Sequence, residues 1–128
     1  MKQNIISKNA PAAIGPYSHA VCANGFVFTS GQLGIDPATG KLSKDVESQT
    51  RQAIENLVNV LQAAGAGIED VVKTTVFVQD LTDFSKINAV YAERFGVSLP
   101  ARSCVEVAAL PAGGLVEIEA VACVKAQV

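Results

Sequence analysis

The sequence has only one histidine, His19, and three cysteines, Cys22, Cys104 and Cys123. A single histidine excludes a histidine-rich metal centre, and no Asp, Glu or His residues recur at the spacing of metal ligands. The cysteines are odd in number and form no CxxC pair, so neither a disulfide framework nor a zinc ribbon is indicated. We therefore expect free thiols and no bound metal.

Basic clusters and long apolar runs are also missing. The formal net charge is −2, and no cluster of Lys and Arg offers an electrostatic surface to nucleic acid. No stretch approaches the roughly 18 apolar residues of a membrane-spanning helix, and residues 1–15 lack the apolar segment of a signal peptide. These absences disfavour charge-driven RNA binding, and they predict a cytoplasmic protein with no membrane partner.

Apolar residues, in contrast, are abundant: 49% of the 128 residues are hydrophobic and 17% are charged. This composition is typical of an ordered globular protein, and the length suits one domain over residues 1–128. Such an apolar content in so small a domain leaves apolar surface to spare, which favours self-association.

Hydrophobic periodicity and turn residues predict the order β-β-(β)-α-β-α-β-β. Strands are expected at Tyr17 to Ala23, Phe26 to Ser30, a short stretch around Gln32 to Ile35, Val71 to Gln79, Ser103 to Ala109 and Leu115 to Lys125, and helices at Asp45 to Ala64 and Asp83 to Phe95. Each helix has one apolar stripe, and two stripes cover only one sheet face. The predicted fold class is therefore α+β, a two-layer sandwich of a mostly antiparallel sheet with two helices on one face.

The last predicted strand carries two carboxylates, Glu117 and Glu119, on the face opposite its apolar side. Burying a carboxylate is costly unless a partner is present, and the nearest cation in sequence is Arg102, at the start of the preceding strand. If these two strands are adjacent, the arginine fork suits a small carboxylate and a glutamate beside it can hold a water molecule. Together they predict a pocket for a small acid.

The uncovered sheet face is expected to carry Val105, Val107, Val121 and the two glutamates. It is too apolar for open water and too acidic for the core of a monomer. Oligomerisation through this face would resolve the conflict.

Four groups of residues, in this order, carry a family resemblance. They are Ala10-Pro11-Ala12 with Ile14-Gly15-Pro16-Tyr17-Ser18; Thr29-Ser30-Gly31-Gln32; Lys73-Thr74-Thr75-Val76-Phe77-Val78 with Asn88-Ala89-Val90-Tyr91; and Pro100-Ala101-Arg102-Ser103-Cys104-Val105 followed by Leu110 and Glu117-Ile118. The whole chain resembles the RidA (YjgF) family of enamine/imine deaminases.

This resemblance implies a homotrimer, similar to trimeric chorismate mutase, with three sheets around a central core and active sites between subunits. It implies cofactor-free hydrolysis of reactive 2-enamino or 2-imino acids, such as 2-iminobutanoate and 2-iminopropanoate, to 2-oxo acids and ammonia. Arg102 would hold the substrate carboxylate and Glu117 would activate the attacking water. The remaining implied ligand contacts, from two chains, are Tyr17, Ser30, Gly31, Asn88 and the backbone of Cys104.

Two other functions stay open. A regulatory protein could bind a small acid through Arg102 without turnover, although Glu117 near a substrate anion argues against it. An RNA-acting nuclease or translation inhibitor is also ascribed to some members of the family, but the sequence offers neither a basic patch nor an aromatic stacking platform.

Two residues complicate the prediction. Cys104 has no Cys-His-Asn/Asp pattern to activate it as a nucleophile, although an exposed thiol beside Arg102 would gain some thiolate character. His19 stands where many members of the family have glutamine. We expect it to share a strand face with Tyr17 and to border the cleft.

Overall fold

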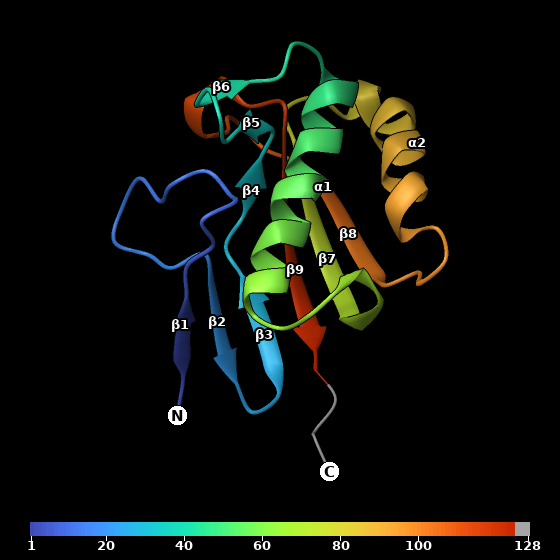
Figure 1. Ribbon diagram of the computed structural model, residues 1–128. Helices are drawn as coiled ribbons and strands as arrows, with labels where there is room; N and C mark the ends of the chain where they lie inside the picture. Colours follow the sequence, from blue (N-terminus) through green and yellow to red (C-terminus); the bar gives the residue numbers. More distant parts are fainter. Residues whose placement is uncertain (125–128) are drawn as a thin grey trace.

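The computed structural model, which describes residues 1–124, is a sheet covered on one face by two helices (Figure 1). Its strands are β1 (Gln3–Ile5), β2 (Ala20–Ala23), β3 (Phe26–Thr29), β4 (Gln32–Leu33), β5 (Ile35–Asp36), β6 (Lys41–Leu42), β7 (Val71–Val78), β8 (Ala101–Glu106) and β9 (Val116–Cys123), and its helices are α1 (Val46–Ala63) and α2 (Phe84–Phe95). Single 3₁₀ turns lie at Ile68–Asp70, Leu81–Asp83 and Pro111–Gly113. The predicted α+β two-layer class is confirmed.

The main sheet has the order β1-β2-β3-β9-β7-β8, and the short strand β4 also pairs with β9. All strand pairs in this sheet are antiparallel except β7 and β8. These two strands run parallel, and α2 lies between them in the sequence. The strands β5 and β6 form a separate two-stranded ribbon.

The pairing of β8 corrects one sequence-based prediction. We expected the last two strands to be neighbours, which would place Arg102 beside Glu117. In the structure β7 lies between β8 and β9. A strand that follows a crossover helix pairs in parallel with the strand before that helix, so β8 joins β7 and forms the sheet edge.

Several predicted boundaries are also wrong. The first predicted strand, which is β2 in the structure, begins at Ala20 rather than Tyr17. The chain turns sharply before it, where the Tyr17 amide donates to the Gly15 carbonyl at 2.9 Å. The strand predicted to end at Ala109 ends at Glu106. The strand β1 was not predicted, and the predicted end of the last strand, Lys125, lies outside the described residues.

Around Gly34 the predicted short strand divides into β4 and β5, which belong to different sheets. A Cβ at Gly34 would lie 2.4 Å from the Gln49 carbonyl oxygen, so only glycine lets the chain pass this close to α1. The predicted turn at Asn24-Gly25 is confirmed, with φ of 51° and 79°.

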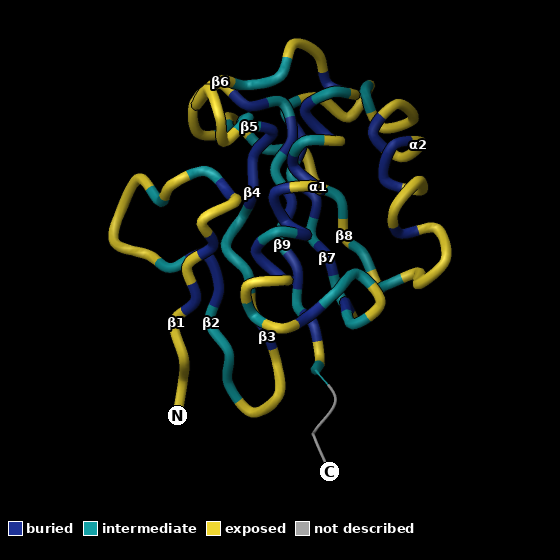
Figure 2. Tube along the Cα trace, in the orientation of Figure 1, coloured by how far each residue is buried: buried dark blue, intermediate teal, exposed yellow. Residues whose placement is uncertain are grey.

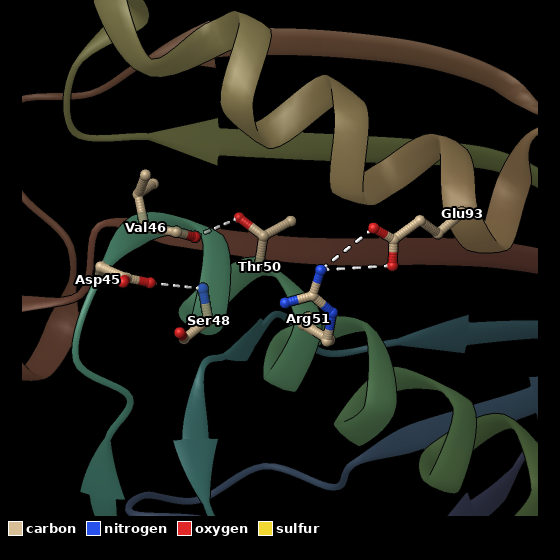
Figure 3. Close-up of polar contacts among 6 residues, drawn as sticks. All are labelled: Asp45, Val46, Ser48, Thr50, Arg51 and Glu93. Atoms are coloured by element: carbon tan, nitrogen blue, oxygen red, sulfur yellow. Dashed lines mark hydrogen bonds and ion pairs between the residues drawn. The ribbon is translucent and has the colours of Figure 1, made fainter.

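Polar contacts fix the start of α1 and tie it to α2 (Figure 3). The Asp45 carboxylate accepts a hydrogen bond from the Ser48 amide at 2.8 Å, and hydrogen bonding by the Ser48 side chain, then by this amide, lowers the pKa of Asp45. One turn on, the Arg51 guanidinium pairs with Glu93 of α2 at 3.1 Å across an exposed surface. The core lies beneath, where the buried faces of β7 and β9 meet α1 (Figure 2).

Replacing Asp45 with alanine should lower the midpoint of urea unfolding, because the Ser48 amide in the first turn of α1 would lose its acceptor. Asp83→Ala is a matched control, since Asp83 precedes α2 without making a capping bond. Because the folded pKa of Asp45 is lowered, its contribution should be present at neutral pH and disappear as the pH falls through that folded value. Equal midpoints for the two variants would contradict this role.

Candidate functional site

All predicted site residues except Cys104 lie in two separate pockets of the chain. The first, here called the Glu117 pocket, has a volume of about 380 Å³. It is lined by Pro11, Ala12, Ile14, Tyr17, His19, Ser30, Gly31, Gln32, Leu33, Ile35, Pro111 and Glu117. Of the predicted residues, Tyr17, Ser30, Gly31 and Glu117 meet here.

Glu117 lies half-buried on β9, and Gly31 gives its carboxylate room. A Cβ at Gly31 would lie 2.7 Å from the Glu117 carboxyl carbon, so any larger residue would displace that side chain. Burial raises the pKa of Glu117, and the like charge of Glu119 on the same face raises it further. A carboxyl group with a raised pKa in a cleft is suited to proton transfer.

The β1–β2 loop, residues 6–19, forms one wall of this pocket and projects from the sheet (Figure 1). Tyr17 is 47% exposed, and its hydroxyl accepts a hydrogen bond from the Ile14 amide at 3.4 Å. The Ser30 hydroxyl donates to the Ser18 carbonyl at 2.7 Å, which joins the loop to the end of β3.

His19 borders the pocket as predicted, but it does not share a strand face with Tyr17, because neither residue is in a strand. Its side chain is 2% exposed and is held by two backbone groups. The Ser7 amide donates to Nδ1 at 2.9 Å, and Nε2 lies 2.8 Å from the Pro11 carbonyl oxygen.

The second pocket, here called the Arg102 pocket, has a volume of about 390 Å³ between α2 and β8. Its lining residues are Asn88, Tyr91, Ala92, Phe95, Gly96, Leu99, Pro100 and Arg102. The Arg102 guanidinium donates to the Asn88 side-chain oxygen at 2.8 Å, so these two predicted residues are in direct contact.

Aromatic rings hold Arg102 in place. Its guanidinium carbon lies 4.7 Å from the centre of the Tyr91 ring and 5.4 Å from that of Phe84. The Tyr91 hydroxyl lies 2.7 Å from the Thr74 hydroxyl oxygen, and its ring stacks on Phe95 with a centroid distance of 4.5 Å. This aromatic support was missed, because at helical spacing Tyr91 and Phe84 read only as part of an apolar stripe.

Cys104 lies two residues from Arg102 on the same face of β8 and packs against the core. Burial raises the pKa of its thiol, and Arg102 offsets only part of that rise. The sequence-based expectation of thiolate character at Cys104 is therefore wrong, because the thiol is half-buried rather than exposed.

Arg102 and Glu117 project from opposite faces of the sheet. Arg102 pairs in register with Thr74, whose side chain faces the helices, whereas Glu117 pairs with Phe77, three residues further along β7. Since side chains alternate along a strand, positions 74 and 77 point to opposite sides. One chain therefore presents the two predicted catalytic residues in separate pockets.

Within residues 1–124, no group of three or more His, Cys, Asp and Glu side chains is arranged to hold a metal ion. Neither helix in this part of the chain combines the length and the apolar character needed to cross a bilayer.

Comparison with known proteins places these residues in a family. The chain matches the family model described as Endoribonuclease L-PSP over residues 7–124. A RutC family protein from Pyrococcus horikoshii is 53% identical over 123 residues, which cover 95% of this chain and 98% of the relative. The 2-iminobutanoate/2-iminopropanoate deaminase of Salmonella typhimurium is 50% identical over 125 residues, with coverage of 95% and 98%.

Solved structures share the fold. The crystal structure of Escherichia coli TdcF with bound serine superposes with a TM-score of 0.92 at 44% sequence identity, and the match covers 96% of this chain and 99% of that one.

Proposed function

Because this chain belongs to the RidA (YjgF) family, whose model is described as Endoribonuclease L-PSP, we propose that it hydrolyses reactive 2-imino and 2-enamino acids to 2-oxo acids and ammonia. The observation that carries this proposal is the pair of pockets: one presents a fixed cation, the other a carboxyl group with a raised pKa. A relative named for this deaminase activity is 50% identical over nearly the whole chain.

Arg102 would bind the substrate carboxylate. A guanidinium forms two parallel hydrogen bonds to a carboxylate, and the contacts with Asn88 and Tyr91 hold the fork ready before substrate arrives. The serine bound to TdcF carries the same carboxylate beside a nitrogen-bearing carbon, which supports a small-acid ligand for this fold.

Glu117 would activate water. It accepts a proton from a water molecule whose oxygen attacks the imine carbon, which forms a tetrahedral carbinolamine. The protonated Glu117 then returns this proton to the nitrogen, the carbinolamine hydroxyl gives up its proton as the C=O bond forms, and the nitrogen leaves as ammonia. Positioning and one proton-transfer group are sufficient for this reaction, because such imines also hydrolyse in water alone.

The two pockets would be brought together by subunits. We propose a homotrimer in which the Arg102 pocket of one subunit faces the Glu117 pocket of the next. The exposed apolar side chains on the uncovered sheet face, among them Phe28 at 47% and Val105 at 42% exposure, support burial of that face by other copies.

The proposal is tested by a coupled assay in which a dehydratase produces the imine from threonine or serine. The wild-type chain should accelerate release of the 2-oxo acid above the rate in its absence. Binding of 2-oxobutanoate without any acceleration would instead favour a regulatory small-acid binder.

The pH dependence of this assay tests Glu117. The carboxylate form is the active base, so kcat/KM should fall on the acid side at a higher pH than for a glutamate with an ordinary pKa. Burial causes most of the rise in the Glu117 pKa, and Glu119→Gln removes the like charge that adds to it, so this variant should move the acidic limb part of the way to lower pH. An acidic limb that stays in place in Glu119→Gln would argue against Glu117 as the titrating group.

A further inference from the structure

The His19 side chain, at the end of the β1–β2 loop just before β2, cross-links the loop to its own earlier residues. Its ring accepts from the Ser7 amide at Nδ1, which leaves Nε2 to carry the proton and donate to the Pro11 carbonyl. Both bonds are formed by a neutral ring of one tautomer, and the ring is nearly inaccessible to solvent. A single side chain therefore bridges positions 7 and 11 of the loop.

The backbone of the same segment contacts the catalytic side of the pocket. The Ser30 amide donates to the His19 carbonyl at 2.9 Å, and the Ser30 hydroxyl donates to the Ser18 carbonyl. The next residue, Gly31, lies against the Glu117 carboxyl group. The backbone of His19 thus connects the loop wall to the segment that lies against Glu117.

The pocket that this wall encloses is mostly apolar. Ile14 of the loop lines this volume of about 380 Å³ together with Leu33, Ile35 and Pro111. Pockets of this size accommodate ligands much larger than a two-carbon side chain. Each methylene that such walls bury tightens binding about fourfold.

We propose that His19 is a positioning residue that holds the β1–β2 loop against the Glu117 pocket, and that the resulting apolar wall selects 2-imino acids with large aliphatic side chains. This inference rests on the proposed deaminase function. The substrate carboxylate lies at Arg102 and the imine carbon near Glu117, so the side chain enters the apolar part of the pocket. A displaced loop would weaken binding of large side chains most.

The test compares His19→Ala with His19→Gln. Glutamine carries an acceptor oxygen and a donor NH₂ group in one planar amide, so it can replace both hydrogen bonds, whereas alanine replaces neither. An amino-acid oxidase with catalase supplies imines from alanine, 2-aminobutanoate and leucine. Wild type and His19→Gln should prefer the leucine-derived imine, and His19→Ala should lose about tenfold of that preference, mainly through KM.

Two further variants serve as controls. Thr50→Val removes one buried hydrogen bond inside α1, away from the pocket, and should leave the preference unchanged. Ile14→Ala removes a wall side chain that is 81% exposed, so it should reduce the preference without affecting folding, even if His19→Ala does not fold.

Equal losses for all three imines in His19→Ala, or an unchanged preference in Ile14→Ala, would overturn the inference. Wild-type chain that hydrolyses none of the imines would instead contradict the proposed function. In that case calorimetric binding of 4-methyl-2-oxopentanoate and 2-oxobutanoate still decides the role of His19. The proposed role of His19 in holding the apolar wall is supported if His19→Ala weakens binding of the larger ligand selectively. It is refuted if binding of both ligands weakens equally or not at all.

Discussion

Replacing Arg102 with alanine should lower kcat/KM for imine hydrolysis by a factor between about 30 and several thousand. Loss of one partner in a desolvated, hydrogen-bonded charge pair costs about 2–5 kcal/mol, and about 1.4 kcal/mol corresponds to a factor of ten. The substrate carboxylate would lose both hydrogen bonds and the fixed orientation that the clamp provides. Steady-state kinetics in the coupled assay measure the loss.

Two further variants test whether the loss of activity comes from the planar guanidinium, from its positive charge or from the removal of any arginine. Arg102→Lys keeps the positive charge but loses the planar fork and its stacking on Tyr91, so its activity should lie between wild type and alanine. Arg94→Ala removes an exposed arginine that pairs with Glu55, and it should retain wild-type activity. A folded Arg102→Ala protein with nearly full activity would rule out the clamp.

Local sequence patterns predicted the elements that depend on local interactions. The helix expected from Asp45 to Ala64 is Val46–Ala63, because its apolar spacing, its capping Asp45 and the Gly65 that follows it at φ 81° all lie within the helix or next to it. The Asn24-Gly25 turn was predictable for the same reason.

Pairing between distant strands was not predictable in this way. The edge strand β8 has the same alternating pattern whether it pairs with β7 or with β9, and only the crossover through α2 decides between them. The wrong pairing of β8 also gave a wrong prediction for the candidate site, because it placed Arg102 and Glu117 side by side in one chain. The resemblance to the family supplied the candidate site residues, but the sequence pattern alone could not place Arg102 and Glu117 on opposite faces of the sheet.

The separation of the two pockets leads to the second prediction: two inactive variants should restore activity when their subunits are mixed. Arg102→Ala keeps the Glu117 pocket, and Glu117→Gln keeps the Arg102 pocket. If each site takes one pocket from each of two neighbouring subunits, random one-to-one mixing leaves about a quarter of the sites with both residues intact. Activity should therefore rise from near zero to about a quarter of the wild-type value.

The mixing requires subunit exchange, either by co-expression or by joint unfolding and refolding, and each variant treated alone is the baseline. A second mixture, wild type with the Arg102→Ala, Glu117→Gln double variant, sharpens the result. If the sites lie between subunits, both mixtures should have about a quarter of full activity. If each site lies within one chain, the first mixture should have no activity and the second about half of full activity. Because Arg102 and Glu117 project from opposite faces of the same sheet, we expect the quarter in both.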